Sequence, residues 1–485
     1  MRKLIMSLLT TKHVDVLNKF LKKLSEGILM FRNTLWKYTA RDYQCILILI
    51  ALAVLLRFPF IAQPHVTQFD EVIYVNYTLH TLFGEPFFDI HPPLARMLFA
   101  YITQTYMPVH MHIHSIEMTF GEEFDDFPYV ALRYALAGMG VLLILVAYLI
   151  GRVIGYRPRG ALLPALLIVF DSALVVYSRS ILPDTILLVC NFLAVLLTFL
   201  AIRSKNKKLF YCFTLFAGIA IGLAISIKWT ALGVLLLLWL IFIMYRRSLG
   251  IIVTGVTLVI VYTAVFVLYF YIFFPHGGVV TNPAGSLNQP WIQSIEFPKN
   301  HSLSEIVRFL PAYHLSMLRA EQDPNVLALT LPGVNPLSWP LAKSSIIFWI
   351  KGNGILTPNI ISIVCGGNPA SWTLSFFVLL FDIGWIFAVY RKTRKLAVDK
   401  DELILIAGFV MNYLPFFFIH RPMYLYHYFT ALIFLFLLIP KVAPRIIKCL
   451  ALLTKDKMFA SVFVYFSLFL VLLNFILMMP STYGF

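Results

Sequence analysis

Charged residues are scarce in this chain: 13% of its 485 residues are Asp, Glu, Lys or Arg, whereas 60% are hydrophobic. A soluble protein of this length would form two to four domains, whose surfaces would need many more charges. Stretches of about 20 apolar residues recur, and each is about long enough to cross a hydrocarbon core of roughly 30 Å. The composition therefore excludes a soluble protein and predicts an all-α polytopic membrane protein.

Cysteine is also rare. The five cysteines are scattered, and most fall in or beside apolar stretches: Cys45, Cys190, Cys212, Cys365 and Cys449. Their spacing fits neither a metal site nor a disulfide framework, so we interpret them as packing residues.

Eleven apolar segments are predicted to span the membrane: 44–62, 131–150, 161–178, 184–202, 209–227, 229–245, 250–274, 370–390, 402–419, 424–440 and 457–478. With the N-terminus inside, every inner connection is basic, and together these connections hold most of the 39 Lys and Arg residues, as the positive-inside rule requires. Most acidic residues fall outside. The net charge of +16 therefore sets topology rather than marking a nucleic-acid surface, and the odd number of spans places the C-terminus outside.

The chain divides into four parts. Residues 1–43 lack the clean apolar stretch of a signal peptide and are expected to form a cytoplasmic basic amphipathic helix. A transmembrane module over 44–274 includes a first outer loop, 63–130, and is followed by a second outer loop over 275–369. Residues 370–485 form a C-terminal transmembrane module.

Both outer loops are too long to be simple connections. The first contains an amphipathic stretch from Leu94 to Tyr106, and in the second we interpret WPLAKSSIIFW (339–349) as an interfacial helix. Long loops over a bundle favour a site at the membrane surface. The absence of an internal repeat gives no support for an inverted-repeat transporter.

The run FDEVIYVNYTLHTLFGEPFFDIHPPLAR follows the first span and places three acids among aromatic residues. Placing a charged carboxylate in such apolar surroundings beside a membrane costs free energy, unless it pairs with a cation or serves the protein's function. Asp70 and Glu71 would point about 100° apart on a helix, so one can act as a base while the other orients a substrate or partner. Asp89 and His91 precede Pro92-Pro93, which would hold them at a bend; the alternative is that they cap the next helix.

Cations are expected on the same outer side. Arg179 lies between the third and fourth spans, Lys228 between the fifth and sixth, and Arg421 and His427 between the ninth and tenth. Such a set suits a lipid-linked phosphate, whose oxygens arginine can bind bidentately. For each cation alone, the alternative is a side chain that reaches to the interface or an ion pair with an outer carboxylate.

Two further patterns are weak. His110, His112 and His114 alternate, but no other ligand lies nearby, which favours a solvated loop over a zinc site. Asn76 and Asn300 match a glycosylation pattern that recurs by chance. No cofactor is required by the sequence, although a divalent cation that bridges a carboxylate and a phosphate stays open.

With those residues in hand, the chain resembles the protein O-mannosyltransferase family, membrane glycosyltransferases of the GT-C type that use polyprenyl-phosphate sugars. Six motifs occur in the family's order: FDE at 69–71, FFDIHPPL at 87–94, SRSILPDT at 178–185, GLAISIKWTAL at 222–232, GGNPASW at 366–372 and LPFFFIHRPMYLYHYFTAL at 414–432. The resemblance implies a GT-C fold and transfer of a sugar, with mannose as the first expectation. The expected acceptors are Ser or Thr hydroxyls of secreted or membrane proteins on the outer face.

The chain departs from the family at several positions. Ala95-Arg96 replaces a frequent Gly-Lys, Tyr426-His427 replaces a pair of histidines, and Thr430 stands where proline is common. These departures weaken the assignment of the acceptor most. No insert is large enough for the MIR domain of eukaryotic members, so the resemblance implies a prokaryotic form and a prokaryotic plasma membrane rather than the endoplasmic reticulum.

The resemblance also implies residue roles. Asp70 matches the family's Asp-Glu pair and is the candidate general base, which accepts the proton of the attacking hydroxyl. The leaving phosphate is already an anion and needs cations rather than an acid. Arg179 is the first choice for that role, and the further candidates are Lys228, Arg421 and His427. The residues expected to orient sugar or acceptor are Glu71, Asp89 and His91.

Two other functions remain as alternatives. A related transferase could move aminoarabinose or another sugar onto a lipid or glycan, although its usual Lys before Pro-Pro-Leu is replaced here by Asp89-Ile90-His91. A transporter or flippase would carry ionisable residues at mid-span, and Asp171 and Asp382 fall inside or at the ends of apolar stretches. Expected partners are the polyprenyl-phosphate sugar, an acceptor protein and membrane lipids, with no nucleic acid. The oligomeric state is undetermined.

Overall fold

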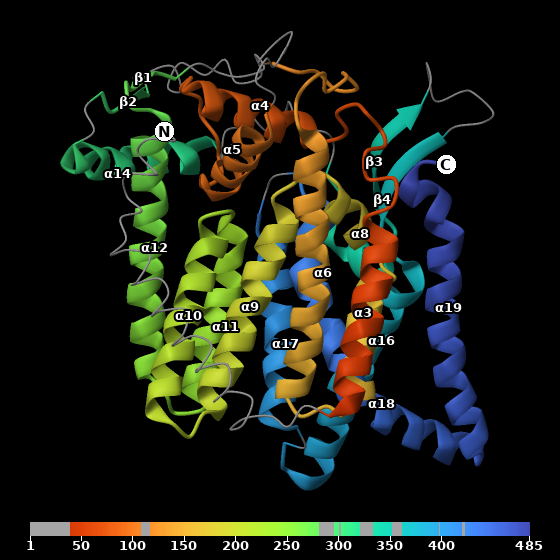
Figure 1. Ribbon diagram of the computed structural model, residues 1–485. Coiled ribbons are helices and arrows are strands. Elements are labelled where there is room, and N and C mark those ends of the chain that lie inside the picture. The colour runs from red at the N-terminus through yellow and green to blue at the C-terminus, as the bar shows by residue number, and fades with distance from the viewer. Residues whose placement is uncertain are drawn as a thin grey trace.

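The computed structural model describes residues 39–107, 117–280, 295–299, 302–320, 333–351, 361–396, 398–419 and 422–485. A bundle of long helices carries shorter elements at one end (Figure 1). The bundle consists of α3 (Ala40–Arg57), α6 (Tyr129–Val153), α7 (Pro158–Val169), α8 (Ser172–Arg179), α9 (Asp184–Arg203), α10 (Lys207–Ile225), α11 (Leu232–Met244), α12 (Leu249–Phe273), α16 (Pro369–Thr393), α17 (Lys400–Tyr413), α18 (Phe429–Thr454) and α19 (Lys457–Tyr483).

Each of the eleven predicted spans corresponds to one of these helices, except that the segment 161–178 is divided into α7 and α8, bent by 64°. Within the described residues, seven helices are long and apolar enough to cross a membrane, or eight if the bent pair α7–α8 counts as one span. The others are α3, which carries three charged residues, and the short helices α11 and α17. The predicted all-α transmembrane fold is confirmed.

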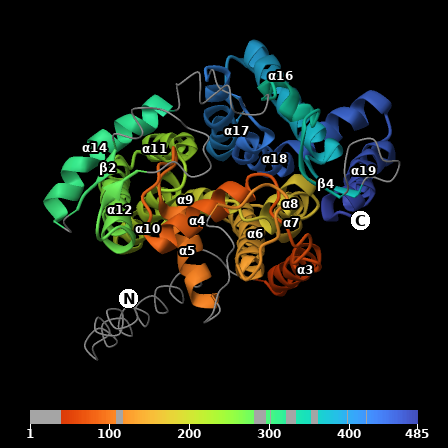
Figure 2. The ribbon, with the colours of Figure 1, turned by 90° about the horizontal axis from the view of Figure 1, so that it is seen from above.

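The segments that follow the first and seventh spans gather at one end of the bundle, at the top of Figure 1. They form α4 (Glu71–Phe83), α5 (Leu94–Tyr106), β1 (Gly278–Val279), β2 (Glu296–Phe297), α14 (Leu303–Ala320), the 3₁₀ helix η3 (Pro336–Leu341), β3 (Ser345–Lys351) and β4 (Ile361–Gly366). Seen from above, α4 and α5 lie over α9 and α10 (Figure 2). The C-terminus also lies at this end.

The amphipathic stretch predicted from Leu94 to Tyr106 is helix α5. The interfacial helix predicted in WPLAKSSIIFW is wrong, because this stretch forms the end of η3 and then strand β3, which pairs antiparallel with β4. Ala342 has a left-handed φ of 49°, which ends the helical turn. Burial then alternates from Ser345 to Phe348, the period of a strand. The amphipathic helix of this loop is α14 instead.

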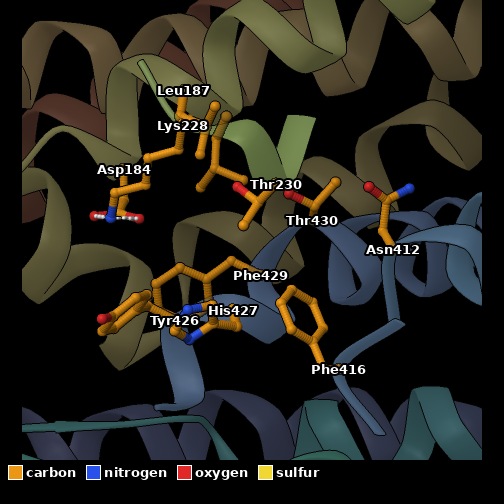
Figure 3. Close-up of a pocket in the computed structure, with 11 residues that line it drawn as sticks. Asp184, Leu187, Lys228, Thr230, Asn412, Phe416, Tyr426, His427, Phe429 and Thr430 are labelled. Carbon is orange, nitrogen blue, oxygen red and sulfur yellow. Dashed lines mark hydrogen bonds and ion pairs between the residues drawn. The ribbon is translucent and has the colours of Figure 1, made fainter. Parts of the chain in front are cut away.

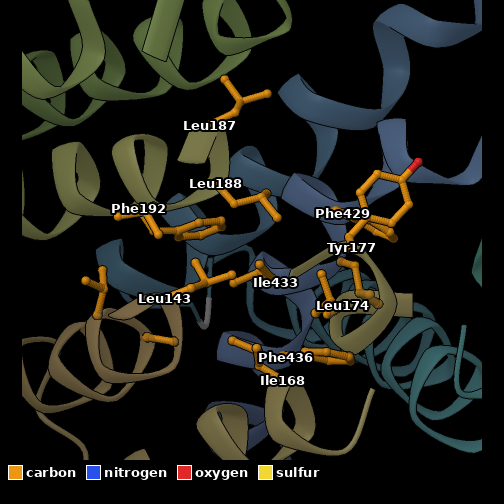
Figure 4. Close-up of a cluster of buried hydrophobic side chains, with 14 of the residues drawn as sticks. Leu143, Ile168, Leu174, Tyr177, Leu187, Leu188, Phe192, Phe429, Ile433 and Phe436 are labelled. Atoms are coloured by element: carbon orange, nitrogen blue, oxygen red, sulfur yellow. The ribbon is translucent and has the colours of Figure 1, made fainter. Parts of the chain in front are cut away.

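The core lies around α9 and the first half of α18. Both helices are apolar on all sides, as expected of helices surrounded by others. Figure 4 shows their side chains interlocking with those of α6, α7 and α8; the residues include Leu143, Ile168, Leu174, Leu188, Phe192, Ile433 and Phe436. In contrast, less than a quarter of the most apolar stretch of α12 and of α19 is buried. These two helices therefore expose most of their apolar side chains.

The bend between α7 and α8 explains the GGNPASW motif. Asp171 sits at the break, fully buried, and accepts hydrogen bonds from the backbone N–H of Leu174 (2.9 Å) and from Trp372 Nε1 (2.6 Å). Asn368 caps α16 and its side-chain amide donates to the carbonyl of Phe170 at 3.0 Å. Asp171 therefore holds the broken helix against α16.

Candidate active site

Asp70 stands at the start of α4, where its backbone carbonyl accepts hydrogen bonds from the N–H groups of Ile73 (3.1 Å) and Tyr74 (3.3 Å). Asp70 is half-buried. Throughout the described part of the chain, nothing donates a hydrogen bond to its carboxylate or forms an ion pair with it. This position leaves the Asp70 carboxylate available to a ligand.

Glu71 is placed quite differently. It is fully buried, and its carboxylate accepts hydrogen bonds from Arg133 Nε (3.0 Å) and Nη2 (2.7 Å) on α6. The backbone N–H of Ile181, just before α9, also donates to Glu71 at 2.7 Å. Glu71 thus binds α4 to two neighbouring segments, and its contacts make it a positioning residue for Asp70 rather than a group that faces a cavity.

Asp89 and His91 lie in the turn that precedes α5. Asp89 is buried and pairs with Arg96, and it accepts a hydrogen bond from the backbone N–H of His91 at 2.9 Å. Arg96 also lies over the ring of Tyr269, 4.6 Å from its centre. Burial raises the pKa of Asp89, against the opposing effect of Arg96. The alternative that Asp89 and His91 cap α5 is wrong, because Pro93 is the N-cap residue and no side chain caps this helix. Asp89 instead holds the turn through the His91 N–H and Arg96.

Two of the predicted cationic residues, Lys228 and His427, line one cavity (Figure 3). Lys228 donates to both carboxylate oxygens of Asp184, at 2.9 and 3.0 Å, and its ammonium lies 4.9 Å from the ring centre of Tyr426. The remaining lining is Leu187, Leu188, Thr230, Asn412, Phe416, His427, Phe429 and Thr430. The cavity therefore combines one buried ion pair with hydroxyl, amide and aromatic groups.

Asp70 belongs electrostatically to this cavity. Burial raises the pKa of Asp70 to about 7, Lys228 lowers it, and Asp184 raises it further. The charges of Lys228 and Asp184 therefore both act on the Asp70 carboxylate. A carboxyl group with a pKa close to neutrality is suited to exchanging protons at physiological pH.

His427 lines the same cavity on η5 (Leu425–Tyr428). Its Nδ1 lies 3.0 Å from the carbonyl of Tyr424, and its ring stacks on Tyr426 with centroids 4.4 Å apart. The His427 ring is also nearly parallel to that of Trp339, with centroids 6.3 Å apart; Trp339 comes from η3 of the second outer loop. The predicted His427 is thus brought to the cavity and is held there by aromatic packing.

Arg179 does not line the cavity. Its guanidinium donates to the carbonyls of Arg57 (2.9 Å), Pro59 (2.7 Å) and Phe60 (3.1 Å), and it lies over the ring of Tyr483. These contacts hold the turn that follows α3. Arg421 lies outside the described residues, as do residues 1–38, the histidines at 110, 112 and 114, and Asn300.

Two cavity residues were not selected from the sequence. Asp184 lies within the SRSILPDT motif without a predicted role, and Tyr426 enters only as a departure from a histidine pair. A signal for Asp184 existed, because it and Lys228 are opposite charges at the outer ends of neighbouring spans. No comparable signal pointed to Tyr426 as the ring beneath Lys228.

Asn76 is not an accessible glycosylation site in this fold. It is buried in α4, where its side chain donates to the carbonyl of Met118 and accepts from the Met118 N–H. Among the residues that the structure describes, no group of three His, Cys, Asp or Glu side chains could hold a metal ion.

Two family models match this chain in order. Residues 47–280 match the dolichyl-phosphate-mannose-protein mannosyltransferase model, and residues 333–485 match the model of the C-terminal four-transmembrane region of protein O-mannosyltransferases. The chain belongs to the protein O-mannosyltransferase family. The predicted resemblance is therefore confirmed.

Curated relatives agree over part of their length. Dolichyl-phosphate-mannose–protein mannosyltransferase 1 of Candida albicans is 30% identical over 204 residues, and its Saccharomyces cerevisiae counterpart is 28% identical over 208 residues. Each alignment covers 40% of this chain but only 22% and 24%, respectively, of these relatives.

The fold agrees over nearly the whole chain. The S. cerevisiae protein O-mannosyltransferase Pmt1-Pmt2 complex bound to the sugar donor matches with a TM-score of 0.74, 16% identity, and coverage of 94% of this chain and 92% of that one. An Archaeoglobus fulgidus oligosaccharyltransferase tethered to an acceptor peptide matches with a TM-score of 0.50 and 13% identity, over 92% of this chain and 55% of its own. The fold is thus the GT-C fold of the family.

Proposed function

We propose that this chain transfers a mannosyl residue from a polyprenyl phosphate to a Ser or Thr hydroxyl of a protein at the outer membrane surface. One observation carries the proposal: Asp70, a carboxylate with no partner in the described chain, interacts electrostatically with both members of the Lys228–Asp184 ion pair, which lines a cavity. Membership of the mannosyltransferase family supports the choice of donor.

The proposed chemistry follows from these groups. Asp70 accepts the proton of the acceptor hydroxyl while the hydroxyl oxygen forms a bond to the anomeric carbon. The bond from that carbon to the phosphate oxygen breaks on the opposite face, so the anomeric centre is inverted. The transition state is oxocarbenium-like, as in glycoside cleavage. The departing phosphate gains negative charge, which Lys228 is placed to stabilise.

The proposed site lies at the end of the bundle that carries α4, α5 and the C-terminus (Figure 1). The basic residues that the positive-inside rule assigns to the cytoplasm fall in connections at the other end, such as 203–208 and 246–249. We propose an inside N-terminus, an outside C-terminus and an active site that faces outward. The prokaryotic plasma membrane stays a prediction.

The structure gives less support to transport. The two acids that left this function open both have partners within the chain: Asp171 accepts from Leu174 and Trp372, and Asp382 pairs with Arg445 at 2.9 Å. Intramembrane acids that mark a transport pathway are expected to face a cavity. Transfer to a lipid or glycan remains the second candidate, because the cavity lining does not identify the acceptor.

The proposal is tested with purified protein in detergent, polyprenyl-phosphate-mannose and a Ser/Thr-rich peptide, with the peptide mass as the readout. A gain of one hexose supports the proposed reaction, and a matched peptide with alanine at every Ser and Thr should gain none. Transfer to a lipid, or release of mannose to water only, would replace the protein acceptor. No turnover of any polyprenyl-linked sugar would refute the enzyme.

The pH dependence of kcat should respond to both members of the ion pair. A base must be deprotonated, so kcat should fall as the pH drops below about 7, the pKa of Asp70. Lys228→Gln removes a charge that lowers this pKa and should move the acidic limb to higher pH. Asp184→Asn removes a charge that raises it and should move the limb to lower pH. Measurement of kcat from about pH 5 to 9 at saturating substrates checks the opposite shifts; equal profiles would exclude Asp70 as the titrating group.

A further inference from the structure

The residue before Asp70 has an unusual backbone. Phe69 has a φ of 42°, in the left-handed region that bulky residues rarely adopt. Such a conformation persists only where the surrounding structure holds it. The contacts that hold Phe69 therefore also determine where Asp70 and the start of α4 lie.

One residue of the second outer loop supplies two such contacts. The ring of Phe69 stacks on that of Phe348, with centroids 4.7 Å apart and an interplanar angle of 26°. The backbone N–H of Phe69 also donates a hydrogen bond to the carbonyl of Phe348 at 3.0 Å. Phe348 thus fixes both the side chain and the main chain of Phe69.

An irregularity in the β3–β4 ladder explains why the carbonyl of Phe348 is available to Phe69. Ile347 pairs with Val364 and Trp349 pairs with Ile363, so Phe348 is the extra residue of a bulge. The extra residue of a bulge is left out of the ladder, and bulges often redirect groups beside active sites. The Phe348 carbonyl can therefore bond to Phe69 instead of β4.

Phe348 also contacts the other side of the site. It is fully buried, and its ring packs against Tyr177 at 5.4 Å. The ring of Tyr177 in turn lies 5.6 Å from that of Tyr426, over which the Lys228 ammonium lies at 4.9 Å. A continuous set of ring contacts therefore joins the Asp70 segment to the cation.

We propose that Phe348 is a positioning residue for sugar transfer, a role that rests on the proposed function. Phe348 keeps the backbone of Phe69 left-handed and so fixes Asp70 relative to Lys228. Phe348 acts through Phe69 and touches no reacting group. Because misplacement of a catalytic group by about 1 Å can cost roughly 100-fold in rate, a single packing contact can control turnover.

Kinetics of Phe348→Ala test this role. We expect kcat to fall roughly 10- to 100-fold while the KM values for donor and peptide stay within about twofold, because the cavity lining is retained. The matched control is Ile346→Ala, which removes a buried side chain from the same face of β3 two residues earlier. Equal losses of kcat in both variants, or a change in KM alone, would overturn the proposal.

A rescue experiment separates positioning from general packing. In the Phe348→Ala background, Phe69→Gly permits a positive φ at no steric cost, whereas Phe69→Ala does not. We expect the glycine double variant to turn over at least about threefold faster than the alanine double variant. Equal rates in the two double variants would contradict a role for the left-handed conformation.

Hydrogen–deuterium exchange tests the contact without turnover. In the substrate-free protein, Phe348→Ala should accelerate exchange at the Phe69 amide, while Ile346→Ala should leave it unchanged. Unchanged exchange in Phe348→Ala would overturn the proposal even in an active enzyme. Accelerated exchange in a protein that fails the mannose assay would retain the positioning contact and reject only the proposed function.

Discussion

Asp70→Asn is expected to lower kcat for mannosyl transfer by about 10²- to 10⁴-fold, because the amide cannot accept the proton of the attacking hydroxyl. The substitution retains the size of the side chain and removes no hydrogen bond or ion pair that the described chain makes. Donor affinity should therefore change little. Initial rates at saturating donor and peptide, followed by mass spectrometry, measure the loss.

Folding provides the control for this variant. Asp70 has a pKa of about 7 in the folded protein and near 3.8 when unfolded, so between these values the native state binds the extra proton. Stability contributed by the protonated group is therefore present at low pH and is lost as the pH rises through about 7. Asp70→Asn should match or exceed the wild-type Tm at pH 8, where ionised Asp70 is disfavoured by burial.

A second carboxylate on the same loop provides the comparison for activity. Glu85 lies at the end of α4 with a half-exposed side chain, 3.4 Å from His80, and Glu85→Gln should retain activity. Near-normal turnover by a well-folded Asp70→Asn protein would rule out Asp70 as the base. A similar loss in Glu85→Gln would attribute the effect to the loop rather than to one carboxylate.

The largest effect on stability is expected at the buried pair of Glu71 and Arg133, both fully inaccessible to solvent. Removing one partner of such a pair typically costs about 3–5 kcal/mol, because the other charge stays buried without compensation. Arg133→Met should be worse than Glu71→Gln, since Arg133 also donates to the carbonyls of Ile61 and Pro64. Thermal unfolding of the detergent-purified variants measures the order.

An exposed ion pair serves as the matched control. Glu296 and Lys299 lie 2.6 Å apart, but both side chains are about half exposed or more, so Glu296→Gln should change the Tm little. A Glu71→Gln protein as stable as wild type would contradict the anchoring role of Glu71. In that case, the position of α4 would have to depend on other contacts.

The sequence predicts the bundle well because hydrophobic length is a local property. The helix from Leu94 to Tyr106 is likewise predictable from the helical spacing of its own apolar residues. The stretch 339–349 is misread because its conformation depends on β4, a partner that comes later in the chain. Its short apolar run fits either a helix or a strand until that partner is known.

The sequence predicts which charged residues lie on the side of the candidate site, but not which partner each of them contacts. The sequence places Asp70, Lys228 and His427 on one side of the membrane, and the structure brings Lys228 and His427 to the cavity. The sequence alone does not show that Arg179 donates to three carbonyls, or that Glu71 pairs with Arg133 on α6. Those roles depend on tertiary contacts between residues far apart in the chain.

The bend at Asp171 has a consequence for how the protein is made. An aspartate within a span opposes insertion by about 2.5–3.5 kcal/mol at the helix centre, and the interrupted backbone between α7 and α8 adds unsatisfied groups. The side chains that satisfy this site, Asn368 and Trp372, are synthesised some 200 residues later. We therefore expect the third span to stay in the insertion machinery, or against neighbouring helices, until α16 has been synthesised.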